Sequence, residues 1–182
     1  MASNNSDTQN LRICVLGNAG SGKTTLALAL ARHFHLPIFH LDRELRHDHF
    51  VLYPPDELFH RHNRIIAGDR WVIDGNYLSL LSDRLERATV AIYLDISRTV
   101  SLPRIIRRYL RNSHVRESIP EGARNKLDWE FLKWSMYYSR KRHLDELKLL
   151  SAGLPHLRVI ILRAGSASEW QKRVIKELEA MD

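Results

Sequence analysis

The sequence has little of what builds disulfide-linked, metal-clustered or membrane-spanning proteins. Its 182 residues contain one cysteine, Cys14, which excludes an internal disulfide and a zinc site built from several cysteines. No apolar run approaches the roughly 20 residues that a membrane-spanning helix needs, so we expect no membrane partner. Residues 1–10 are polar and lack the basic and apolar regions of a secretory signal. We therefore expect a disordered tail on a soluble, cytoplasmic protein.

The rest of the composition is typical of a folded domain. Hydrophobic residues make up 44% of the chain and charged residues 27%, and no linker divides residues 11–182. We expect one domain over these residues. The formal net charge is +7, and a positive balance attracts nucleotides, nucleic acids and acidic lipids. Charge alone does not separate these partners from a basic surface that only keeps the protein in solution.

Short apolar segments alternate with helical patterns along the chain. Strands are predicted at residues 11–16, 37–41, 71–73, 89–94 and 157–162. Helices are predicted at residues 23–35, 55–67, 98–111, 127–150 and 168–181. Between the third strand and the fourth, no element is predicted. This alternation is typical of an α/β fold in which helices cover both faces of a parallel sheet, giving three layers.

The segment that follows the first predicted strand carries the most specific motif. It matches G-x-x-x-x-G-K-[ST] at every position and comprises Gly17, Asn18, Ala19, Gly20, Ser21, Gly22, Lys23 and Thr24, with Thr25 next to it. In such a loop the backbone N–H groups turn toward phosphate oxygens, and the helix that follows adds the positive end of its dipole. We predict that these residues bind ATP with Mg²⁺, with Lys23 at the β- and γ-phosphates and Thr24 on the metal ion. The alternative is a glycine-rich turn that matches by chance.

Aspartates follow three of the predicted strands, at the edge where ligands of parallel sheets bind. They are Asp42, Asp74 and Asp95. Asp74 ends an apolar strand and precedes a glycine, so we predict that it orients Mg²⁺ together with Thr24. Asp42, close to His40 in sequence, is predicted to orient a phosphate acceptor, and Asp95 to cap the next helix. For each aspartate, a purely structural role in a turn or cap is the alternative.

Arginines are spaced along one face of the helix predicted over residues 98–111. They lie at positions i, i+3, i+4 and i+7 and are Arg104, Arg107, Arg108 and Arg111. Like charges at this spacing repel one another, so an anionic partner is favoured. We predict that Arg107, Arg108 and Arg111 neutralise a transferred phosphoryl group and that the segment 112–125 acts as a lid. A solvated basic face and a nucleic-acid surface are the alternatives.

Nearly the whole chain after Asn10 resembles a known family. The residues GNAGSGKTT at 17–25, LPIFHLD at 36–42 and WVIDGNY at 71–77 are similar to bacterial P-loop proteins named topology modulation proteins, which are related to adenylate and shikimate kinases. The resemblance implies a five-stranded parallel sheet of the adenylate kinase type, with strand order 2-3-1-4-5. It also implies ATP binding and a kinase activity, and the family name suggests an effect on DNA topology.

The chain departs from the related kinases on the acceptor side. Adenylate kinases have Asp-Gly-Phe-Pro-Arg where this chain has Asp74 and Gly75 followed by Asn76, Tyr77 and Leu78, so the arginine that grips the acceptor phosphate is missing. The Asp-x-Asp and triple-glycine patterns of shikimate kinases are missing too. We therefore predict a kinase that transfers the γ-phosphoryl group of ATP to an unidentified small molecule or nucleotide. The alternative is a nucleic-acid-associated ATPase or a nucleotide-dependent regulator of DNA topology. The oligomeric state stays open.

Overall fold

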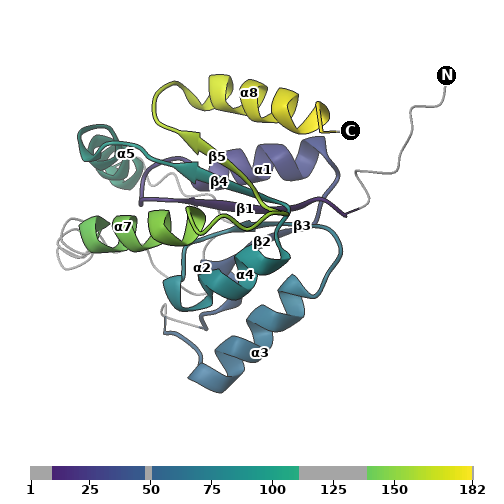
Figure 1. Cartoon of the computed structure of the whole chain (residues 1–182). Coiled ribbons are helices and arrows are strands. Elements are labelled where there is room, and N and C mark those ends of the chain that lie inside the picture. The colour runs from purple at the N-terminus through teal and green to yellow at the C-terminus, as the bar shows by residue number, and fades with distance from the viewer. Residues whose placement is uncertain (1–9, 48–50, 111–138, 182) are drawn as a thin grey trace.

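The centre of the molecule is a parallel β-sheet (Figure 1). A computed structural model describes residues 10–47, 51–110 and 139–181. The strands are β1 (Arg12–Gly17), β2 (Ile38–His40), β3 (Trp71–Asp74), β4 (Val90–Leu94) and β5 (Arg158–Leu162). They form a five-stranded sheet in the order β2-β3-β1-β4-β5. The α/β class and the strand order that the family resemblance implied are both confirmed.

Helices cover both faces of this sheet (Figure 1). One face is covered by α1 (Lys23–His33) and α8 (Ala167–Glu179), and the opposite face by α3 (Pro55–Ile66), α4 (Leu81–Arg87) and α7 (Ser139–Leu150). Two short helices, α2 (Leu41–Glu44) and the 3-10 helix η3 (Leu78–Leu80), follow β2 and β3. The helix α5 (Arg98–Leu110) lies on the side toward which the carboxyl ends of the strands point. The βα loops therefore meet at one edge of the sheet.

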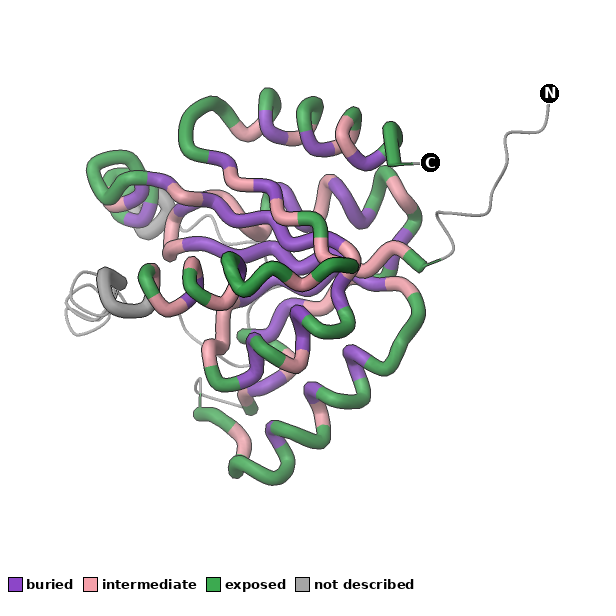
Figure 2. Tube along the Cα trace, in the orientation of Figure 1, coloured by how far each residue is buried: buried purple, intermediate pink, exposed green. Residues whose placement is uncertain are grey.

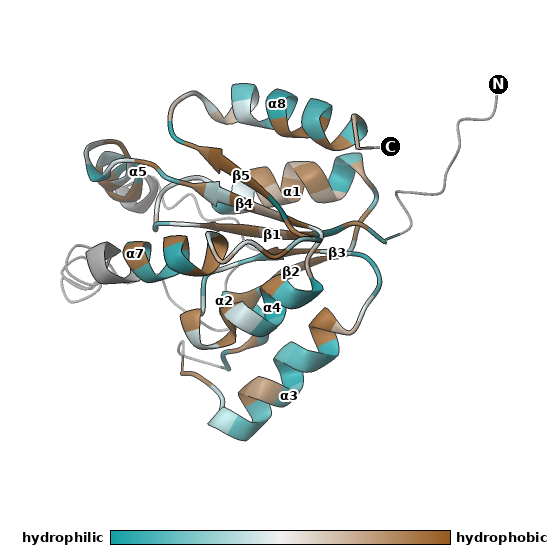
Figure 3. Cartoon of the chain, viewed as in Figure 1, coloured by the Kyte–Doolittle hydropathy of each residue, from teal (hydrophilic) through white to brown (hydrophobic). Residues whose placement is uncertain are grey.

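The sheet separates two apolar cores because side chains of a strand point alternately to its two faces. In β1, Ile13 and Val15 pack toward α1 and α8, whereas Cys14 and Leu16 pack toward α3, α4 and α7. Figure 2 shows the central strands β1, β3 and β4 as the most continuously buried part of the chain, whereas the edge strands β2 and β5 are buried in part. Figure 3 shows the strands as largely apolar, while the helices carry polar residues as well. A sheet buried on both faces explains why its strands read as nearly unbroken apolar runs.

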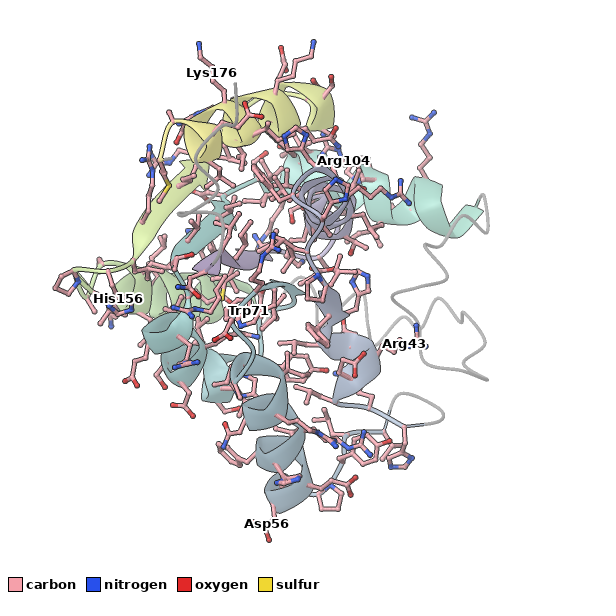
Figure 4. All side chains as sticks on the ribbon, turned by 90° about the vertical axis from the view of Figure 1, so that its right-hand side faces the viewer. Arg43, Asp56, Trp71, Arg104, His156 and Lys176 are labelled. Carbon is pink, nitrogen blue, oxygen red and sulfur yellow. The ribbon has the colours of Figure 1, made fainter. Side chains whose placement is uncertain are left out.

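Side chains labelled in Figure 4 show this layering. Trp71 of β3 lies in the interior and is fully buried. Asp56 lies at the tip of α3, and Lys176 points outward from α8.

The first turn of α8 is closed by a capping box, in which the Ser166 side chain accepts from Glu169 N and the Glu169 carboxylate accepts from Ser166 N.

Sequence and structure differ in a few elements. Leu41 begins α2, although the strand was predicted to run through it, and the helix predicted from residue 98 is described only to Leu110. The helices η3 and α4 occupy residues 78–87, for which no element was predicted. Together they fill only ten residues, too few for a clear helical period. They bury Leu80, Leu81 and Leu85 under the sheet.

Some predictions lie outside the described residues. These are the disordered tail, apart from Asn10, the lid-like segment 112–125, and the part of the helix predicted over 127–150 that precedes Ser139. Among the helices that the structure describes, none is long and apolar enough to cross a membrane.

The interior on the α3 side holds a buried histidine. His62 of α3 is fully buried. Burial, together with the nearby positive charge of Arg84, lowers the pKa of His62 to about 4, from 6.5 when exposed. His62 is therefore neutral in the folded protein at neutral pH, and protonating it opposes folding.

This arrangement predicts a pH-dependent stability. Between pH 6.5 and 4 the unfolded chain binds a proton at His62 that the folded chain does not, so the contribution is complete above pH 6.5 and is lost as pH falls toward 4. Between pH 7 and 4.5, the free energy of unfolding should fall by about 2 kcal/mol more in the unchanged protein than in His62→Leu. Urea unfolding at both pH values measures this difference. The exposed His60→Leu should keep the full slope, and equal slopes in His62→Leu and the unchanged protein would contradict the assignment.

Candidate functional site

The loop Gly17–Thr24 joins β1 to α1 at the carboxyl edge of the sheet. Its backbone bends at three glycines in the left-handed region, with φ of 137° at Gly17, 72° at Gly20 and 102° at Gly22. At Gly20 a Cβ atom would lie 2.6 Å from the carbonyl oxygen of Ser101, at the start of α5. The loop therefore requires glycine at this position both for conformation and for space.

The start of α1 is open to an anion. The N-cap residue Gly22 offers no side chain, and the first turn contains no acidic residue. The first N–H groups of a helix have no carbonyl within the helix to bond, and they carry the positive end of its dipole. Lys23 adds its ammonium group, which donates to the carbonyl of Asn18 at 2.9 Å. The buried hydroxyl of Ser21 has no hydrogen-bond partner among the described residues. The free N–H groups at the start of α1, the Ser21 hydroxyl and the nearby ammonium of Lys23 fit a phosphate-bearing ligand.

Beside this loop lies an oxygen pair that fits a divalent cation. The Thr24 hydroxyl donates to Asp74 Oδ2 at 2.7 Å, so the end of β3 touches the first turn of α1. His40 Nδ1 lies 3.1 Å from the same carboxylate oxygen. The Asp74 residue is only 6% exposed. The structure thus brings together the two residues predicted to hold Mg²⁺, an ion that prefers oxygen ligands and binds through one or two carboxylates with phosphate oxygens.

The turn after β3 connects this pair to the glycine-rich loop. Asn76 Oδ1 accepts a hydrogen bond from Gly17 N at 3.2 Å. At Gly75 φ is 133°, and a Cβ atom there would lie 2.9 Å from the Cβ atom of Leu41. Tyr77 has φ of 42°, which is strained for a side chain of its size. Asn76 and Tyr77 were noted in the sequence only as a departure from adenylate kinases. Their position after Asp-Gly at a strand end is the signal that they belong to the site.

On the acceptor side, Tyr77 joins two charged residues. Its hydroxyl donates to Asp42 Oδ1 at 3.0 Å and accepts from Arg46 Nε at 2.7 Å. Burial and the neighbouring carboxylate of Asp42 raise the pKa of Tyr77, so the phenol stays protonated. Asp42, predicted to orient an acceptor, lies in α2 with 61% of its side chain exposed. Arg46 was missed, because nothing in the local sequence shows that it faces residue 77.

A hollow of about 360 Å³ lies at the edge of the sheet, between α1, β2 and α2. It is lined by Leu28, Ala31, Arg32, Leu36, Ile38, His40, Arg43 and Glu44. His40, Arg43 and Glu44 flank Asp42 in sequence, and the volume lies in the range of small-molecule sites. The hollow offers room for a small molecule, although the residues that line it do not include Asp42 itself.

Only part of the arginine face is described. Arg104 Nη1 donates to the carbonyl of Ser21 at 3.4 Å, and its guanidinium carbon lies 5.9 Å from the centre of the Trp170 ring. Figure 4 shows Arg104 beside α1. Arg107 is an exposed residue of α5. Arg108 lies in α5 without a described side chain, and Arg111 lies outside the described residues. Arg104, one of the four arginines of this predicted face, thus lies at the loop in the described part of the chain.

Asp95 follows β4, as predicted, but it does not cap the next helix, because the carbonyl of Ser97 accepts from Ser101 N at the start of α5. Its carboxylate accepts from Arg163 Nε at 3.2 Å and lies 3.7 Å from His143 Nε2 of α7. The neighbouring Tyr93 contacts His143 Nδ1 at 2.7 Å and donates to the buried Glu146 at 3.1 Å. Asp95 therefore ties the end of β4 to the segment after β5 and to α7.

Comparisons by sequence found no relative. No family model matches the chain, and no curated protein matches it.

Several solved structures with similar folds are kinases. A shikimate kinase from Aquifex aeolicus superposes with a TM-score of 0.58 at 18% identity, over 93% of this chain and 97% of that one. A shikimate kinase from Bacteroides thetaiotaomicron gives 0.55 at 19% identity, over 93% and 98%. A sugar kinase from Janibacter sp. gives 0.54 at 15% identity, over 93% and 95%. At such low identity the likeness concerns the fold alone, and the chain has the P-loop kinase-like fold of these enzymes.

Proposed function

We propose that the protein is a kinase that transfers the γ-phosphoryl group of ATP to a small hydroxylated molecule or nucleotide. The observation that carries this proposal is the 2.7 Å contact of Thr24 with Asp74 beside the open start of α1. It would join an anion site to a cation site at the carboxyl edge of a parallel sheet. Both sites are needed to bind a metal-complexed triphosphate. The kinase-like fold supports the same conclusion.

On the ATP side of the site, each residue would bind through an N–H group, an ammonium group or an oxygen atom that lies at the loop. The loop residues Gly17 to Thr24, with Thr25 in the first turn of α1, would surround the phosphates with N–H groups. Lys23 would move its ammonium from the Asn18 carbonyl to the phosphate oxygens. Thr24 and Asp74 would hold Mg²⁺, and His40 keeps the Asp74 carboxylate oriented. Bound MgATP supplies the phosphoryl group and a cation that withdraws its negative charge.

On the acceptor side, Asp42 would orient the hydroxyl group that receives the phosphoryl group. The hollow beside His40 and Arg43 offers room for the acceptor. Arg104 already reaches the loop, and the sequence spacing predicts Arg107, Arg108 and Arg111 on the same helical face. These arginines would neutralise the charge that develops during transfer.

The finer assignments stay predictions. They are membership of the topology modulation proteins, a cytoplasmic location, one domain over residues 11–182 and a lid at 112–125. The alternative function is a nucleotide-dependent regulator that binds nucleic acid, for which the net charge of +7 and the exposed arginines of α5 are the support. It requires DNA binding that weakens by several powers of ten as salt is raised. Binding to duplex DNA between 50 and 200 mM salt separates the two functions.

The first test is an ADP-release screen with MgATP over nucleosides, nucleotides, sugars and hydroxy acids. Lys23→Ala removes the ammonium group nearest the phosphates, so turnover of any acceptor found should fall about 100-fold or more. Lys176→Ala, which removes an exposed ammonium on α8, should leave turnover unchanged. Circular dichroism checks that both variants stay folded. Full turnover in folded Lys23→Ala would refute the kinase assignment.

The second test concerns the cation. Asp74→Asn keeps the shape of the side chain and its capacity to accept from Thr24 but removes the charge that attracts Mg²⁺. Calorimetric titration should show that the Mg²⁺ concentration needed for half-maximal ATP binding rises about tenfold. Affinity for ATP in excess EDTA should hold or rise, since a repulsive charge is gone. Asp69→Asn, an exposed control, should change neither quantity. An unaltered Mg²⁺ requirement in Asp74→Asn would remove Asp74 from the metal site.

A further inference from the structure

Arg84 places a charged group inside the α4 side of the core. The residue is fully buried, and its Nη2 donates to the backbone carbonyl of Asn76. Its Nε and Nη1 have no hydrogen-bond partner among the described residues. Taking a guanidinium out of water is costly, and apolar replacements of buried ions are often neutral or stabilising. A contribution to the stability of the fold therefore does not explain why residue 84 is an arginine and not an apolar residue.

The carbonyl that Arg84 holds belongs to the turn that links the two halves of the candidate site. The side chain of Asn76 accepts from Gly17 N, the first residue of the glycine-rich loop. The next residue, Tyr77, contacts Asp42 and Arg46 on the acceptor side. One residue thus faces the donor loop and its neighbour faces the acceptor cluster. The carbonyl of Asn76 lies between these two contacts, and Arg84 fixes it.

The conformation of this turn needs such an anchor. Gly75 and Tyr77 both have positive φ, and for Tyr77 a left-handed backbone is strained because of its Cβ atom. A strained residue keeps its conformation only where the surroundings determine it. A guanidinium buried in an apolar core has few other conformations or acceptors. Its hydrogen bond therefore restrains the turn more than a bond from a solvent-exposed donor would.

Negative and polar groups surround the buried guanidinium. Burial lowers the pKa of Arg84, while Cys14, the buried Glu146 of α7, Asp74 and Tyr77 act in the opposite direction. Glu146 is itself held by the hydroxyl of Tyr93 at 3.1 Å. His62 of α3 faces Arg84 as well and is neutral at pH 7. The carboxylates of Asp74 on β3 and Glu146 on α7 thus offset part of the cost of burying the guanidinium under the turn.

We propose that Arg84 is a positioning residue that holds the Gly75–Tyr77 turn in one geometry, so that the donor loop and the acceptor cluster keep a fixed relation. It does not touch the ligand sites; it acts through Asn76 and Tyr77. The functional part of this inference rests on the proposed function, because that function assigns ATP to one site and the acceptor to the other. The structural part, in which Arg84 is coupled to Gly17 through Asn76, is independent of it.

Amide hydrogen exchange of the unliganded protein tests the structural part. Arg84→Met keeps an unbranched side chain in the apolar site but has no donor, so exchange at Gly17 and Tyr77 should speed up about tenfold relative to core amides of β4. Arg84→Lys, which retains one donor, should show a smaller increase, and Asn76→Ala should match Arg84→Met at Gly17. Arg87→Met is the matched control, because Arg87 is another α4 arginine that donates to backbone carbonyls, those of Ile66 and Ala67. Unchanged exchange at Gly17 in Arg84→Met would overturn the proposal.

The functional part is tested with the same variants. If Arg84 positions the turn, kcat in Arg84→Met should fall about tenfold or more while the dissociation constant of MgATP changes less than about twofold, and Arg84→Lys should recover part of kcat. A general loss of stability would instead speed exchange throughout the core. Normal kcat in a variant with fast Gly17 exchange would overturn the positioning role. If the unchanged protein transfers no phosphoryl group, the kinase proposal fails, while the exchange data still decide whether Arg84 holds the turn.

Discussion

The parallel pairing of β1 with β3 on one side and β4 on the other sets the position of every group in the candidate site. Val15 pairs with Asp74, and Gly17 pairs with Leu94. The three chain segments that leave these strands therefore start side by side at one edge of the sheet. The loop after β1 curls over the start of α1, and the residue that ends β3 meets the first turn of that helix. A shift of one residue in this register would turn Asp74 to the opposite face.

Two charged side chains near the end of β3, Asp74 and Arg84, are buried. Asp74 is buried and accepts from Thr24 and His40, so its carboxylate is held by two donors on the α1 side of the sheet. Arg84 lies on the other side, where it faces Glu146. In a medium of low dielectric constant, such charges interact more strongly than at the surface. The end of β3 is therefore held from both faces of the sheet, and the turn that follows has little freedom.

Local patterns predicted most of the framework. Apolar strands between helices indicated a parallel sheet, because a strand buried on both faces has few polar positions. The motif from Gly17 to Thr24 could be located because its residues are contiguous. The short helices were not predicted: α2, η3 and α4 are too brief to show a period. Their position is decided by packing, as for Leu81 and Leu85 beneath the sheet.

The residues of the candidate site divide in the same way. The sequence by itself determined the glycine-rich loop, the strand that precedes it and the acidic residue at the end of β3, since each depends on residues that are neighbours in the chain. Only the tertiary structure decided that Asp74 meets Thr24, that Asn76 bonds Gly17 and that Arg84 lies under the turn. These partners are separated by 50, 59 and 8 residues. Local propensity does not show which residues so far apart in the sequence will meet. The burial of apolar faces against the sheet brings these partners together.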